Sequence, residues 1–141
     1  MIVLDTNVVS ALMTDDQAID PWLATVRPDE LYTTVMTQAE IRFGLARLPD
    51  GRRKSDLTRR ADHLFDDISE RVLVFEVRAA DFYGQLVASR QGAGHSLSVP
   101  DAIIASITAV NRASLATRNA RDFDGCGIEV VNPYDFATPA H

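Results

Sequence analysis

Four acidic residues occupy positions from which their carboxylates could act together. Asp5 directly follows the apolar, β-branched run Ile2 to Leu4. Glu40, in the segment "TQAEIRFGL", comes after a second strand-like run, Leu31 to Val35. Asp101 opens the apolar stretch "DAIIASITAV", and Asp122 comes after a further short run. Like charges packed together raise pKa values and oppose a compact state, and a divalent cation removes that cost. Oxygen ligands without His or Cys favour Mg²⁺ or Mn²⁺, which also take phosphate oxygens as ligands.

Such a site predicts phosphodiester hydrolysis, because a bound cation can activate water and stabilise the charge that develops on the leaving oxygen. Each acid also has a structural alternative. Asp5 or Asn7 could cap a helix that begins near Val8, and Thr37-x-x-Glu40 has the pattern of a capping box.

The two later acids have structural alternatives of the same kind. Asp101 follows Pro100 in what reads as the first turn of a helix, where the helix dipole favours an acid. Asp122 could cap a turn, as could Asp124, which ranks lower because it stands beside Gly125 in an open loop. The hypothesis of a site therefore depends on whether the fold brings the acids together.

The pattern of apolar residues predicts elements that would do so. Short strands are expected at 2–4, 31–35, 72–75, 115–117 and 128–131. Between them, helical periodicity runs through 19–26, 41–48, 57–68, 82–87 and 103–110. Apolar strands that alternate with helix-length crossovers predict an α/β fold, a three-layer α/β/α sandwich with a central parallel sheet. Ligands of such sheets bind beyond the carboxyl ends of the strands, which is where the acids would converge.

Length and composition favour a single domain spanning 1–141. The chain has 141 residues, of which 46% are hydrophobic and 24% charged, enough for a real core. It shows no secretory signal and no apolar stretch of membrane-spanning length, so we expect a cytoplasmic protein without a membrane partner. Its single cysteine, Cys126, cannot form an internal disulfide and is expected to fill space in the core.

The charge balance argues against simple electrostatic attraction to nucleic acid. The formal net charge is -6, and of the 14 basic residues all but Lys54 are arginine. A local arginine surface or a bound divalent ion could still invert the local field. Gly51 to Lys54 read as a basic turn between two helices, most typical of a solvated loop, and Gly92 and Gly94 bracket a loop before His95, to which no role is assigned.

Four segments together resemble the PIN-domain ribonucleases, specifically the toxin subunits of VapBC-type toxin–antitoxin pairs. They are "IVLDTNVVSAL", "TQAEIRFGLARLP", "VPDAIIASITAV" and "LATRNARDFDGCGIEVVNPY", and they cover essentially the whole chain. The resemblance implies a PIN-like fold and an acidic site that binds Mg²⁺ or Mn²⁺. The residues that it implies for the metal and for catalysis are Asp5, Glu40, Asp101 and Asp122, and those that it implies as supporting polar residues are Thr6, Asn7, Thr117 and Asn119.

The same resemblance implies a function and partners. It predicts a metal-dependent endoribonuclease toxin that cuts structured RNA such as tRNA or rRNA, and a cognate VapB-type antitoxin whose C-terminal segment blocks the site. It also predicts a homodimer, with higher assembly with the antitoxin left open. The number of metal ions, one or two, is open as well.

Two other readings compete with the ribonuclease. The chain could be a module that binds RNA or an antitoxin with little or no turnover, its acids holding only a structural ion. It could also be an aspartyl-phosphate phosphatase or a receiver domain, since both place an Asp after the first strand. That phosphatase would need a second Asp where Asn7 stands, and both would need a lysine near the phosphate, whereas Lys54 lies in the basic segment.

Overall fold

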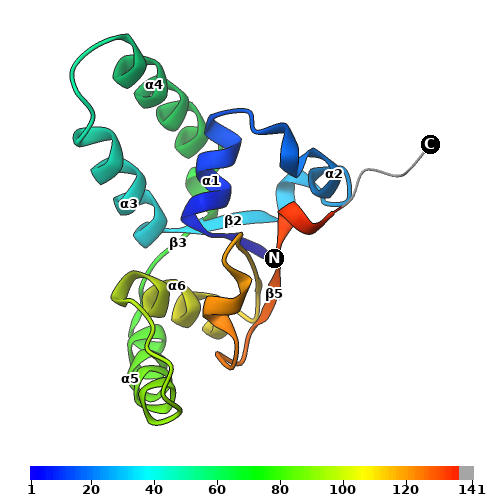
Figure 1. Cartoon of the computed structure of the whole chain (residues 1–141), viewed down its shortest axis with the longest axis vertical. Coiled ribbons are helices and arrows are strands. Elements are labelled where there is room, and N and C mark those ends of the chain that lie inside the picture. The colour runs from blue at the N-terminus through cyan, green and yellow to red at the C-terminus, as the bar shows by residue number, and fades with distance from the viewer. Residues whose placement is uncertain (137–141) are drawn as a thin grey trace.

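A parallel sheet organises the chain. The computed structural model describes residues 1–136, so residues 137–141 of the predicted domain lie outside the described residues. Five strands, all paired in parallel, follow the order β3-β2-β1-β4-β5. Figure 1 labels β2, β3 and β5 of this sheet. They are β1 (Ile2–Leu4), β2 (Leu31–Thr34), β3 (Val72–Leu73), β4 (Ser114–Ala116) and β5 (Glu129–Val131). Each predicted strand is present, within two residues at either end.

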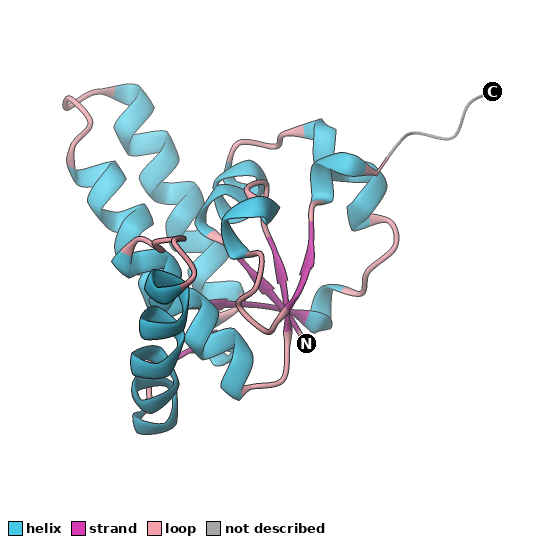
Figure 2. Cartoon of the chain, turned by 60° about the horizontal axis from the view of Figure 1, so that its bottom comes forward, coloured by secondary structure: helices cyan, strands magenta, loops and turns pink. Residues whose placement is uncertain are grey.

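Alternation along the strands divides the core into two layers. Val3 and Leu115 pack with residues of one cluster, whereas their neighbours Leu4 and Ala116 pack with the other. The Leu4 side is covered by α1 (Thr6–Met13), α2 (Asp20–Leu23), α3 (Val35–Ala46) and α4 (Arg52–Asp67). The Val3 side is covered by α5 (Val77–Gly92) and α6 (Val99–Val110). Helices therefore lie on both faces of the sheet, and the predicted α/β/α sandwich is confirmed (Figure 2).

Short 3-10 turns complete the connections. They are η1 (Gln17–Ile19), η2 (Pro28–Glu30), η3 (Ser69–Arg71), η4 (Ala120–Phe123) and η5 (Pro133–Asp135). The helix expected across 19–26 is only η1 followed by the single turn of α2. Pro21 can begin a helix, but after Leu23 the chain leaves the helix and reaches β2 through the short turn η2. The Gly-containing loop expected before His95 is present, and Gly94 takes a φ of +79°, which suits glycine.

Helices α3 and α4 form an arm that projects from the sheet (Figure 1). Arg42 on α3 makes an ion pair of 2.7 Å with Asp62 on α4, and its guanidinium lies over the Phe65 ring. The predicted basic turn is wrong, because Arg52 to Lys54 already form the first turn of α4 and only Gly51 stands before it. This part of the chain presents its basic residues on a helix.

Two expectations about the rest of the chain can be compared with the structure. Cys126 is buried with Leu86 and Phe123, so it fills space in the core as predicted. Across residues 1–136, none of the helices has the length and apolar character that crossing a membrane would require.

Candidate metal centre at the carboxyl edge of the sheet

The site begins where the strand order changes direction. After β1 the chain moves to β2 on one side, whereas β4 pairs with β1 on the other side. In open α/β sheets this switch point opens a crevice beyond the carboxyl ends of the strands. Asp5 follows β1 at this point, and its backbone N–H donates to the carbonyl oxygen of Ala116, 2.9 Å away on β4.

Asp5 has both a structural and an electrostatic role. It is the N-cap of α1, its Oδ1 accepting from the backbone N–H of Thr6 at 2.8 Å, so the helix begins at Thr6 and not near Val8. Its Oδ2 accepts from the Thr117 hydroxyl at 2.7 Å and more weakly from Asn7 Nδ2 at 3.4 Å. The capping alternative is therefore correct for one oxygen, while the other belongs to a polar network across the switch point.

The environment of Asp5 opposes its ionisation. The residue is only 5% exposed, and burial is the largest cause that raises the pKa of its carboxyl group. The hydrogen bonds from Thr117, Thr6 and Asn7 lower this pKa, and the nearby charge of Glu40 raises it further. The net shift is upward, so an adjacent cation would favour the ionised form of Asp5.

Glu40 is held by Thr6 and does not cap a helix. The predicted capping box is wrong, because β2 ends at Thr34 and α3 starts at Val35, with the Thr34 hydroxyl accepting from the backbone N–H of Thr37 at 3.1 Å. Glu40 thus lies in the second turn, where its Oε1 accepts from the Thr6 hydroxyl at 2.7 Å. The Thr37 hydroxyl is 3.2 Å from that of Thr6. Thr6 therefore links the beginning of α1 to Glu40.

Asp101 stands in the first turn of α6, as predicted. Ser98 is the N-cap, its hydroxyl accepting from the backbone N–H of Asp101 at 3.2 Å, and Pro100 occupies the first turn. Burial raises the pKa of the half-buried Asp101, and the charges of Asp5 and then Asp122 raise it further, against the hydrogen bond from Ser98. Asp101 therefore lies close enough to Asp5 and Asp122 for their charges to affect its ionisation.

Asp122 is the most exposed member of the group. It lies in η4, where the buried side chain of Phe123 anchors the turn to the core. The negative charges of Asp5 and Asp122 raise the pKa of Asp101, and the negative charge of Glu40 raises the pKa of Asp5. The fold therefore brings all four sequence-predicted acids to one edge of the sheet.

The supporting residues join the ends of β1 and β4. Asn7 accepts from the backbone N–H of Arg118 at 3.0 Å, and its Nδ2 lies 3.3 Å from the Thr117 hydroxyl. Asn119 is exposed and contributes its backbone N–H, which donates to that same hydroxyl at 3.1 Å. Thr117 is fully buried and is the centre of this network.

The donor set fits a hard divalent cation. All four candidates are carboxylates, and two have pKa values raised by burial and by neighbouring negative charge, which a cation would offset. Within the described residues, no three or more His, Cys, Asp or Glu side chains are grouped closely enough to hold a metal ion. This placement suits an ion such as Mg²⁺, which keeps several waters and is commonly bound by one or two carboxylates plus substrate phosphates.

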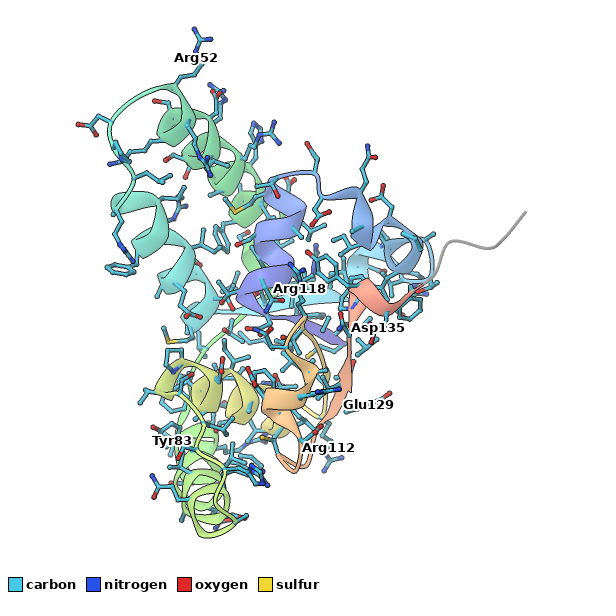
Figure 3. The ribbon with its side chains drawn as sticks, in the orientation of Figure 1. Arg52, Tyr83, Arg112, Arg118, Glu129 and Asp135 are labelled. Carbon is cyan, nitrogen blue, oxygen red and sulfur yellow. The ribbon has the colours of Figure 1, made fainter. Side chains whose placement is uncertain are left out.

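Sequence reasoning missed cationic residues beside the acids. Asp101 and Asp122 line a cavity of about 600 Å³ together with Arg90 and Arg121. On another side, Arg118 lies close to the start of α1 (Figure 3), with its guanidinium 4.7 Å from the centre of the Tyr134 ring. Arg118 and Arg121 flank Asn119 in the motif "TRNARDF", which was a usable signal, whereas nothing local connects Arg90 to the site.

The fold is that of a PIN domain. The sequence matches the PIN domain family over residues 2–126, so this chain belongs to that family and the predicted family is confirmed. Among curated proteins, it is 33% identical to the VapC ribonuclease Y4jK of Sinorhizobium fredii, a match covering 96% of this chain and 99% of that protein. It is 34% identical to the plasmid stability protein StbB of Pseudomonas syringae pv. tomato, with the same coverage.

Solved structures agree with the family. The chain superposes on the structure of FitAB bound to the IR36 DNA fragment with a TM-score of 0.88 and 28% identity, covering 98% of this chain and 99% of the other. The crystal structure of FitAcB from Neisseria gonorrhoeae gives a TM-score of 0.87 at 27% identity, covering 96% and 99%.

Proposed function

We propose that this PIN domain is a toxin that cleaves RNA endonucleolytically with the help of Mg²⁺ or Mn²⁺. The observation that carries the proposal is the buried carboxylate of Asp5, coupled by repulsion to Glu40 and Asp101 at the switch point of the sheet. The names of the VapC ribonuclease and of the toxin FitB, 28% identical, support a nuclease that acts as a toxin.

The residues that would hold the ion are Asp5, Glu40, Asp101 and Asp122, one or two of them directly and the others through water molecules bound to the ion. When bound, the ion would supply a Lewis acid for the phosphate and an activated water. The chain's own contribution is orientation: Thr117 fixes one oxygen of Asp5, and Thr6 fixes one oxygen of Glu40. Hydrogen bonds of this kind orient ligating carboxylates and tune their affinity for metal.

A cognate antitoxin is part of the proposal. The neighbouring structures FitAB and FitAcB support it through their names, which are those of complexes. In this chain, a hollow of about 230 Å³ between α1, α3 and α4 is lined by Met13, Ile41, Leu45 and Leu57, and it also contacts Glu40. A largely apolar segment of the antitoxin in this hollow would reach the acids and block the site.

A homodimer is also proposed. Three apolar residues are exposed where β3 leads into α5, namely Val74, Phe75 and Val77, the last of which begins α5 and is 78% exposed. Because β3 is an edge strand, this apolar surface suits a second copy of the chain. The oligomeric state measured by light scattering for wild type and for Val77→Asp tests this part, since a charge there should shift a dimer toward monomer.

The nuclease is tested with purified protein and total cellular RNA. Reactions contain Mg²⁺, Mn²⁺ or EDTA, with Asp5→Asn as the site variant and Asp67→Asn, an exposed acid at the end of α4, as the matched control. Discrete fragments that disappear with EDTA and with Asp5→Asn, but persist with Asp67→Asn, support the nuclease. Intact RNA in every reaction, from folded protein free of antitoxin, would favour the RNA- or antitoxin-binding module.

A further inference from the structure

A mixed-charge cavity adjoins the acidic edge and shares Asp101 and Asp122 with the proposed metal site, whereas its arginines have no role in that site. Its volume is about 600 Å³, and it lies between the loop that joins α5 to α6 and the turn η4. Its charged lining residues are Asp101, Asp122 and Asp124 together with Arg90 and Arg121, and His95 also lines it. This volume is sufficient for a nucleotide-sized ligand.

Arg90 is held in this cavity by a packing arrangement that depends on a glycine. A Cβ atom added to Gly125 would come within 2.9 Å of Arg90 Cζ and still closer to Nη1, so the guanidinium lies directly against the Gly125 backbone. Gly125 has a φ of +76°, a second reason for glycine at this position. The side chain of Arg90 therefore reaches from the last turn of α5 to the loop that follows Asp122.

The N–H groups of the Arg90 guanidinium are available for hydrogen bonds to a ligand. Within residues 1–136, neither Arg90 nor Arg121 makes an ion pair or a side-chain hydrogen bond, although Arg90 is half-buried and a guanidinium carries five N–H donors. Burial raises the pKa of the neighbouring Cys126 thiol, and the charge of Arg90 opposes that rise. Arg90 is thus a positioned cation without an anionic partner in the described chain.

We propose that Arg90 and Arg121 form a subsite for the phosphate of the nucleotide next to the one that is cleaved. The inference rests on the proposed ribonuclease, and it adds where a second phosphate of the RNA is bound. Planar guanidinium groups match phosphate oxygens with paired hydrogen bonds. The acids would hold the ion at the cleaved phosphate and the two arginines would bind its neighbour, and the arginines would offset the net charge of -6 locally.

The test measures binding of a fluorescein-labelled oligouridylate of twelve nucleotides in EDTA, by anisotropy, at several KCl concentrations. Arg90→Gln and Arg121→Gln should each weaken binding about tenfold, because each removes a charged hydrogen-bond donor to phosphate. Each should also lower the slope of log K against log salt by about 0.7, the value for one phosphate contact on a single strand.

Arg112→Gln is the matched control. Arg112 is exposed just after the end of α6, about 18 Å along that helix from its first turn, and its loss changes the net charge equally. Gly125→Ala provides a second route, since its methyl group would displace the Arg90 guanidinium and should weaken binding as Arg90→Gln does. Thermal melting shows that each variant is folded.

The outcomes separate the subsite from the proposed function. Binding and salt slope of Arg90→Gln equal to those of Arg112→Gln, or no oligouridylate binding by wild type, would overturn the subsite even if total RNA is cleaved with Mg²⁺. Loss of binding with Arg90→Gln, in a protein that cleaves no RNA with any metal, would support phosphate binding at Arg90 but contradict the nuclease, and with it the placement of this site beside a cleaved nucleotide.

Discussion

The carboxylate of Asp5 is stabilised by hydrogen bonds and destabilised by burial and by a neighbouring charge. Asp5 caps α1 and accepts from Thr117, yet burial and Glu40 raise the pKa of its carboxyl group. A group whose pKa is raised on folding stabilises the protein at pH values below its unfolded pKa, and that stabilisation is lost as pH rises through the folded pKa. In the metal-free protein, ionisation of Asp5 and Asp101 therefore lowers the free energy of unfolding.

The first prediction concerns Asp5→Asn and Asp101→Asn. Each should abolish RNA cleavage while leaving the metal-free melting temperature equal or higher, because an amide relieves repulsion and Asn also caps helices well. RNA cleavage with Mg²⁺ measures the first effect, and thermal melting in EDTA measures the second. A marked fall in melting temperature would mean that the acid acts mainly in the scaffold.

The second prediction concerns how Asp5 and Asp101 change the free energy of unfolding with pH. In metal-free buffer, the free energy of unfolding of wild type should fall relative to that of the Asp5→Asn, Asp101→Asn double variant as pH rises from about 3.8 through the raised folded values. Urea denaturation at several pH values measures this difference. Parallel curves would contradict the raised pKa values.

The third prediction concerns Thr117, which is buried and donates to Asp5. Thr117→Val keeps the shape but removes the hydroxyl, so it should raise the pKa of Asp5 further and lower metal affinity or activity about 10–100-fold. Metal titration by calorimetry, with Thr108→Val as a buried control on α6, measures the loss. An equal effect of both variants would indicate general destabilisation.

At the scale of elements, α3 places Glu40 through the position of its N-cap. Thr34 caps the helix, so Glu40 falls in the second turn, facing Thr6. Thr34→Val should reduce the free energy of unfolding by about 1 kcal/mol, the usual cost of a lost N-cap. Thr37→Val, equally buried, should cost less because the Thr37 hydroxyl makes only a 3.2 Å contact with another hydroxyl. Chemical denaturation of the pair decides which threonine is the cap.

At the scale of the whole molecule, a bound divalent ion should stabilise the fold. Metal that binds the folded state at ten times its Kd adds about 1.4 kcal/mol to the free energy of unfolding. Melting with and without Mn²⁺ should therefore show a rise for wild type and none for the Asp5→Asn, Asp101→Asn double variant. An equal rise in both proteins would place the ion elsewhere on this acidic chain.

The sequence by itself determined the elements and the candidate acids. Apolar β-branched runs and 3.6-residue periodicity are local properties, so the strands at 2–4 and 31–34 and the helix behind Asp101 could be read directly. Helix starts were less accurate, as Thr34 and Thr37 show, because two threonines three residues apart offer equivalent local caps and the end of β2 selects between them.

Only the tertiary structure decided which side chains meet. The strand order that sets β4 beside β1 brings Thr117 to Asp5 across 112 positions of sequence, and the turn of α1 brings Thr6 to Glu40. Packing also brings Arg90 against Gly125, a contact that no local sequence pattern predicts. Such pairs depend on the order of strands and on packing between layers, which are properties of the whole chain, whereas each residue's own preferences act over only a few neighbours.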